Sequence, residues 1–89
     1  MERWRLIVSG RVQGVGYRQA CCLRAQSLGL GGWVRNRPDG RVELEAEGCS
    51  QNLEQLRLWC ESGPPGAHVS GVSECVIPPG GHDWFEVRR

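Results

Sequence analysis

The amino-acid sequence predicts an α+β fold in which two helices cover one face of an antiparallel sheet and a short extra strand follows at the C-terminus. Three observations lead to this prediction. Strand-like and helical stretches follow one another in the order β, α, β, β, α, β, β; a strong turn sequence separates the two middle strands; and 89 residues leave room for one domain, residues 1–89. A chain of this length buries roughly 60–65% of its unfolded surface, which is enough for one core.

The first strand and the first helix are predicted by the spacing of their apolar residues. Trp4, Leu6 and Val8 alternate along the strand, which is typical of a strand with one buried face. A helical stripe follows, at spacings of four, four and three residues, and comprises Tyr17, Cys21, Ala25 and Leu28. We expect this helix to begin near Tyr17 and to end at a cap formed by Gly29.

A hairpin is predicted after the first helix. Residues 33–37 form its first strand, and Pro38-Asp39-Gly40 has the chemistry of a tight turn. The next strand, residues 41–47, alternates strictly between apolar and acidic residues from Val42 onward. We expect the apolar ones to face the core and the acidic ones to face outward: Val42, Leu44 and Ala46 against Glu43, Glu45 and Glu47.

The second half of the chain repeats the order of helix and strand. A helix is expected over residues 51–62, with Ser50 as its N-cap and Gly-Pro-Pro-Gly at 63–66 as its end. Its apolar stripe comprises Leu53, Leu56, Trp59 and Cys60. Strands over 69–77 and 84–88 complete the chain. Together the elements form the ferredoxin-like βαββαβ sandwich, with one additional C-terminal strand.

The segment between the first strand and the first helix is the most informative part of the chain; it reads Gly10-Arg11-Val12-Gln13-Gly14-Val15-Gly16-Tyr17-Arg18. Its three glycines allow a tight turn in which several backbone N–H groups point into one small hollow. The helix N-terminus behind that hollow favours an anion, and the guanidinium of Arg18 matches the geometry of a phosphate. The segment therefore predicts a cradle for a small phosphate.

Several kinds of phosphate chemistry lack their residues in this sequence. The chain contains no lysine, which a Walker-type loop requires, and no cysteine has an arginine six residues after it, as a cysteine phosphatase requires. Asp39 and Asp83 are the only aspartates, and His68 and His82 stand alone, so we expect no aspartyl-phosphate chemistry, no metal site and no cofactor. Positioning and electrostatics remain as the means of catalysis.

Charge and cysteine content predict the partners and the cellular compartment of the protein. The formal net charge is +1 and no basic stripe is present, so we expect neither nucleic acid nor a membrane surface as a partner. The five cysteines are odd in number and no signal-peptide pattern precedes them, which indicates reduced thiols in a cytoplasmic protein. Size and balanced charge favour a monomer.

The sequence resembles the acylphosphatase family. The resemblance rests on four blocks in the family's order and spacing: Gly10 to Arg18, Gly32-Trp33-Val34-Arg35-Asn36, Pro38-Asp39-Gly40 and Gly63-Pro64-Pro65-Gly66. It implies a hydrolase that cleaves the carboxyl–phosphate anhydride of small acylphosphates without a metal or a covalent intermediate. It also implies that the family's arginine and asparagine correspond to Arg18 and Asn36.

Acylphosphate hydrolysis suits a site with so few reactive groups. The leaving carboxylate is stable as an anion and needs no general acid, and a loose transition state for phosphoryl transfer requires little of a base. The attacking water is assigned to Asn36, whose side-chain carbonyl can accept its hydrogen bond. The phosphoryl oxygens are assigned to the guanidinium of Arg18 and to the backbone N–H groups of Gln13, Gly14, Val15, Gly16 and Tyr17.

Two other classes of function remain open at this point. A non-catalytic module could sense a small phosphorylated metabolite with the loop and Arg18, but it would have no use for the amide of Asn36. An RNA-recognition module on the same fold would carry paired aromatic residues on its central strands. The strand at 41–47 presents glutamates there instead, which would repel a phosphate backbone.

Overall fold

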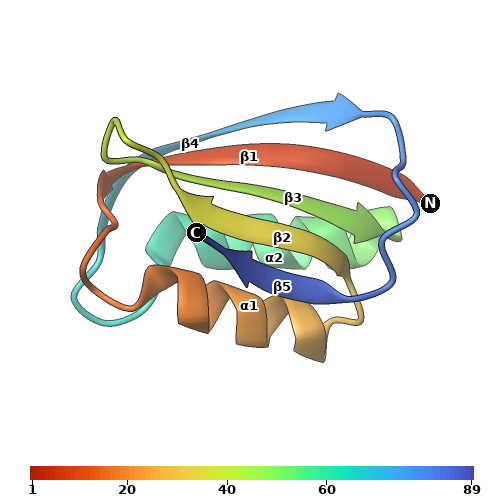
Figure 1. Ribbon diagram of the computed structural model, residues 1–89, viewed down its shortest axis with the longest axis horizontal. Coiled ribbons are helices and arrows are strands. Elements are labelled where there is room, and N and C mark those ends of the chain that lie inside the picture. The colour runs from red at the N-terminus through yellow and green to blue at the C-terminus, as the bar shows by residue number, and fades with distance from the viewer.

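A computed structural model describes all 89 residues, Met1–Arg89. One five-stranded sheet forms the first layer and two helices form the second, against one face of the sheet (Figure 1). The elements along the chain are β1 (Glu2–Arg11), α1 (Tyr17–Ser27), β2 (Gly31–Asn36), β3 (Val42–Gly48), α2 (Ser50–Ser62), β4 (His68–Ile77) and β5 (Phe85–Arg88). The predicted ferredoxin-like order is confirmed. No helix is long and apolar enough to cross a membrane.

The strands lie in the order β4-β1-β3-β2-β5. β1 and β3 pair antiparallel at the centre, with Leu6 opposite Leu44, and β4 and β2 pair antiparallel on their outer sides. β5 pairs with β2 in the parallel direction, so the sheet is mixed rather than antiparallel throughout. The reason is that β4 runs antiparallel to β2 and the chain reverses once over residues 78–84, which aligns β5 with β2.

The core lies between the sheet and the helices. The alternation predicted for β1 and β3 is confirmed, since their apolar residues face the helices and are buried. Each helix buries one stripe against them, and Trp59 at the edge of the second stripe is only partly buried. The buried positions are Trp4, Leu6, Val8, Val34, Val42, Leu44, Ala46 and Phe85 from the strands and Tyr17, Cys21, Ala25, Leu53, Leu56 and Cys60 from the helices.

The opposite, open face of the sheet carries the glutamates of β3, as predicted, but two of them are not solvated. Glu43 and Glu47 are each only 7% exposed. Arg3 lies 2.9 Å from Glu45 and 3.2 Å from Glu47, and Arg35 lies 2.7 Å from Glu43. Arginine side chains from β1 and β2 therefore cover the carboxylates, because neighbouring strands place opposite charges side by side.

The helix ends were predicted with unequal success. α1 ends at Ser27 with Leu28 as its C-cap, and the predicted cap residue Gly29 follows one position later, in a left-handed conformation with φ 70°. The N-cap of α2 is Cys49 and not Ser50, which is the first residue of the helix. Cys49 continues the extended backbone that leaves β3, and its carbonyl accepts the N–H of Leu53. The path of the chain therefore outweighs the preference of serine for the cap position.

Candidate functional site

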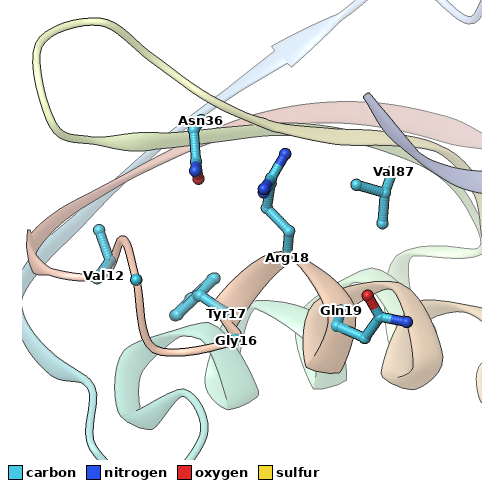
Figure 2. Close-up of a pocket in the computed structure, with 8 residues that line it drawn as sticks. Val12, Gly16, Tyr17, Arg18, Gln19, Asn36 and Val87 are labelled. Carbon is cyan, nitrogen blue, oxygen red and sulfur yellow. The ribbon is translucent and has the colours of Figure 1, made fainter. Parts of the chain in front are cut away.

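A cavity of about 160 Å³ opens at one end of the sheet, where the β1–α1 loop, the start of α1 and the end of β2 meet (Figure 2). One water molecule takes about 30 Å³ in the liquid, so the cavity has room for more than a water. The segments that line it are far apart in the sequence. The lining residues are Val12, Gly14, Gly16, Tyr17, Arg18, Gln19, Asn36 and Val87.

The loop beside the cavity turns through two glycines in left-handed conformations. Gly14 and Gly16 have φ angles of 74° and 78°, and no atom lies within 4 Å of a Cβ built at either position. The backbone conformation, and not crowding, therefore requires glycine there. The backbone N–H groups of residues 13–17 donate none of the backbone hydrogen bonds in the turns, loops and caps. These N–H groups, at the N-terminus of α1, are available to an anion.

Side chains at both ends of this loop hold it in place. The amide of Gln13 donates to the carbonyls of Arg37 and Arg41 at 2.8 and 2.9 Å, which ties the loop to the β2–β3 hairpin. The hydroxyl of Tyr17 donates to the carbonyl of Cys60 at 2.8 Å, which ties the start of α1 to α2. Burial raises the pKa of the Tyr17 hydroxyl well above its usual range, so this group remains a donor.

Arg18 and Asn36 enter the space beside the loop from opposite layers (Figure 2). Arg18 rises from the first turn of α1 toward the sheet, and its Nη1 donates to the carbonyl of Arg88 at 3.2 Å. This contact fixes one edge of the guanidinium and leaves its other N–H groups to a ligand. Asn36, the last residue of β2, points back toward the loop, and its Oδ1 is buried without a hydrogen-bond partner. A buried acceptor of this kind is costly unless a ligand or water pairs with it.

The structure brings most of the predicted site residues together. Gly14, Gly16 and Tyr17 line the cavity beside Arg18 and Asn36. Gln13 and Val15 are not among its lining residues; the side chain of Gln13 holds the hairpin and Val15 packs against the core.

Three further lining residues, Val12, Gln19 and Val87, were not among the site residues expected from the sequence. For Val87 a partial signal exists, because its spacing of two from the apolar Phe85 places both on the same face of β5. The sequence did not indicate that β5 pairs with β2 and so brings Val87 to the cavity.

Near the cavity, the thiol of Cys22 is the nucleophile that needs to be considered. It lies one turn after Arg18 in α1, half-buried, with its sulfur 3.5 Å from the carbonyl of Phe85. Burial, together with the carboxylate of Glu86, raises the pKa of this thiol, which keeps it protonated and a poor nucleophile. Nowhere in the molecule do three or more His, Cys, Asp or Glu side chains gather in a group that could hold a metal ion. What the cavity offers is a set of anion donors together with the buried, unpaired amide oxygen of Asn36.

Comparisons with known proteins agree on one family. The sequence profile of the acylphosphatase family matches residues 4–87. An acylphosphatase of Synechococcus sp. (strain WH7803) is 62% identical over 87 residues, which are 98% of this chain and 87% of that protein. An acylphosphatase of Cupriavidus metallidurans is 59% identical, over 96% of this chain and 90% of that protein. The crystal structure of acylphosphatase from Bacillus subtilis has a TM-score of 0.97 to this chain, covers 100% of both chains and is 39% identical.

Proposed function

The chain belongs to the acylphosphatase family, and from this premise we propose that the cavity beside the β1–α1 loop is its active site. The reaction hydrolyses the carboxyl–phosphate anhydride of a small acylphosphate to a carboxylate and inorganic phosphate. One observation carries the assignment of the site. Unpaired N–H groups of the loop, the guanidinium of Arg18 and the unpaired amide oxygen of Asn36 converge there from separate segments.

The loop and Arg18 hold the phosphoryl group. The backbone N–H groups of residues 13–17 and the free N–H groups of Arg18 donate to its oxygens, where the negative charge of the transition state is spread. These donors are fixed before the substrate arrives, since the loop is tied to the hairpin and to α2. Removing one such donor group from a preorganised site costs about 3–4 kcal/mol of transition-state stabilisation.

Asn36 orients the water. Its Oδ1 accepts a hydrogen bond from a water that faces the phosphorus atom, in line with the bond to the acyl oxygen. The water oxygen bonds to phosphorus, the bond to the acyl oxygen breaks, and its electron pair leaves with the carboxylate. The protons of the water remain with the phosphate or pass to solvent. No side chain has to act as a general acid, because the leaving carboxylate is stable as an anion.

The test is steady-state hydrolysis of benzoyl phosphate, with a chelator present, by the parent protein and by two variants. We expect Arg18→Ala to lower kcat/KM about 10²–10³-fold and to raise the inhibition constant of inorganic phosphate. Asn36→Ala is expected to lower kcat with KM near the parent value, because the orientation of water matters only in the transition state.

Two substitutions of the same residue types serve as controls. Arg11→Ala removes an exposed arginine outside the cavity, and Asn52→Ala removes an asparagine that donates to the carbonyl of Leu28. Both variants are expected to retain the parent activity. A parent protein that binds phosphate without turnover would instead be a sensor of phosphorylated metabolites, and loss of activity in chelator would overturn the metal-free mechanism.

We further propose that residues 1–89 act as one domain and as a monomer in the cytoplasm, without nucleic acid or a membrane as a partner. The net charge of +1 and the glutamates on the open face of the sheet support the absence of a polyanion partner. All five cysteines are free thiols, as in a reducing compartment. Light scattering should give the mass of one chain, 9.9 kDa, and a mass of twice that value would contradict the monomer.

A further inference from the structure

The position of Arg18 depends on the last residue of β5. The Nη1 of Arg18 donates to the main-chain carbonyl of Arg88, and β5 is a four-residue edge strand that pairs only with β2. The ends of short edge strands fray unless a side chain ties them down. Whatever fixes the end of β5 therefore fixes the acceptor that orients Arg18.

The side chain of Arg88 provides such a contact on the open face of the sheet. Val87 faces the cavity, so the next residue of the strand points to the other face. There the guanidinium of Arg88 lies 5.0 Å from the ring centroid of Trp33 in β2, within the range of a cation–π contact. Trp33 is itself only 8% exposed, so its ring is a fixed platform. The carboxylate nearest to Arg88 is that of exposed Glu86, at 3.6 Å, and Arg35, opposite Arg88 in β2, has its guanidinium 6.0 Å from the centroid of the same Trp33 ring.

We propose that Trp33 and Arg88 are positioning residues for the hydrolysis. The ring of Trp33 holds the side chain of Arg88, this side chain fixes the end of β5, and the carbonyl of Arg88 then orients the guanidinium of Arg18 on the opposite face. The inference rests on the proposed role of Arg18. Neither Trp33 nor Arg88 lines the cavity, so both act through the main chain of β5.

The experiment compares Arg88→Met, Trp33→Leu, Trp33→Phe and the double variant Trp33→Leu/Arg88→Met in benzoyl phosphate hydrolysis and in competitive inhibition by inorganic phosphate. Arg88→Met keeps the carbonyl and removes the cation, and Trp33→Phe keeps an aromatic face. We expect Arg88→Met and Trp33→Leu each to lower kcat/KM about twofold to fivefold, the size of a partly exposed cation–π contact. KM and the phosphate inhibition constant should rise together. The double variant should lose no more kcat/KM than the more impaired of the two single variants. Trp33→Phe should keep a kcat/KM near that of the parent.

Glu86→Gln is the matched control, because it removes the carboxylate charge beside Arg88. It should leave KM and the phosphate inhibition constant unchanged. Partial unfolding of Trp33→Leu would lower kcat alone, whereas a displaced Arg18 raises the phosphate inhibition constant. A phosphate inhibition constant of Arg88→Met equal to that of the parent would overturn the inference. So would losses of kcat/KM that are additive, in free energy, in the double variant. Either result leaves the loss in Arg18→Ala intact, whereas failure of the proposed function would abolish that loss as well.

Discussion

The two faces of the sheet differ in whether their polar groups have partners. On the open face the glutamates of β3 have arginine partners, and Arg3 alone holds both Glu45 and Glu47. On the helix-covered face, at the cavity, the Oδ1 of Asn36 has no partner and the N–H groups of the neighbouring loop make no backbone hydrogen bond. Paired groups stabilise the fold, and buried unpaired ones lower its stability until a ligand arrives. The difference separates the residues that hold the sheet together from those that we propose to meet the substrate.

The largest effect is expected at the cavity, from Arg18→Lys. An ammonium keeps the positive charge but not the planar fork, so its three N–H groups radiate from one nitrogen and cannot reproduce two parallel bonds to phosphoryl oxygens beside the contact with the carbonyl of Arg88. We expect kcat/KM for benzoyl phosphate to fall about 10²-fold, with the melting temperature unchanged. Arg11→Lys makes the same replacement at an exposed position and should be silent. A loss of activity that follows a loss of thermal stability would place Arg18 among the structural residues instead.

The sequence predicts those features of the fold that depend on one strand alone and misses those that depend on distant segments. The faces of β3 were predicted correctly, because the period of two belongs to the strand itself. The burial of Glu47 was not, since it depends on Arg3 in β1 and on the N–H of Gly80, which are 44 and 33 residues away along the chain. The parallel direction of β5 was missed for a similar reason, because it depends on where the chain crosses after β4.

The site was predictable to the extent that its parts are contiguous in the sequence. Gly14, Gly16 and Arg18 stand within five residues, and their place between a strand and the start of a helix predicts an anion cradle. Asn36 lies 18 residues further on, and only the resemblance to the family singled it out. Val87 lines the cavity through the pairing of β5 with β2, which no local pattern in either strand specifies.

On the open face, Arg3→Met is expected to have the opposite phenotype to Arg18→Lys. The side chain of Arg3 is 4% exposed, and its removal leaves the carboxylates of Glu45 and Glu47 without their cation. We expect a loss of about 2–3 kcal/mol in the free energy of unfolding, somewhat below that of a fully buried pair, because Glu47 keeps its backbone donors. The parent kcat should be retained, as measured after urea titrations have established that the variant is folded.

Arg5→Met is the matched control for this prediction. Arg5 lies two residues further along β1 on the same face, but its side chain is exposed and forms no ion pair. Its replacement should change the free energy of unfolding by no more than about 0.5 kcal/mol. A lower kcat in folded Arg3→Met would show that the open face contributes to the chemistry through more than the end of β5.

The smallest effect is expected in the pH dependence of stability at Glu47. The N–H of Gly80 donates to its Oε1 at 2.6 Å and the N–H of Gly81 to its Oε2 at 3.0 Å. The hydrogen bond from Gly80 is the main cause that lowers the pKa of Glu47 below its ordinary value, with Arg3 and Gly81 adding to it and burial opposing it. The folded state therefore binds this proton less readily than the unfolded chain does.

The sign of the effect follows from this lowered pKa. The stabilisation from the charged form of Glu47 is complete above the unfolded pKa of about 4.3 and is lost as the pH falls through the folded-state value. We expect Glu47→Gln to melt below the parent at pH 7 and to approach the parent below about pH 4, as the parent carboxylate becomes protonated. Calorimetry at several pH values between these limits measures the gap, and Glu86→Gln corrects for the change in net charge. A gap that stays constant with pH would mean that Glu47 stabilises the open face through its shape and hydrogen bonds, and that its charge contributes nothing.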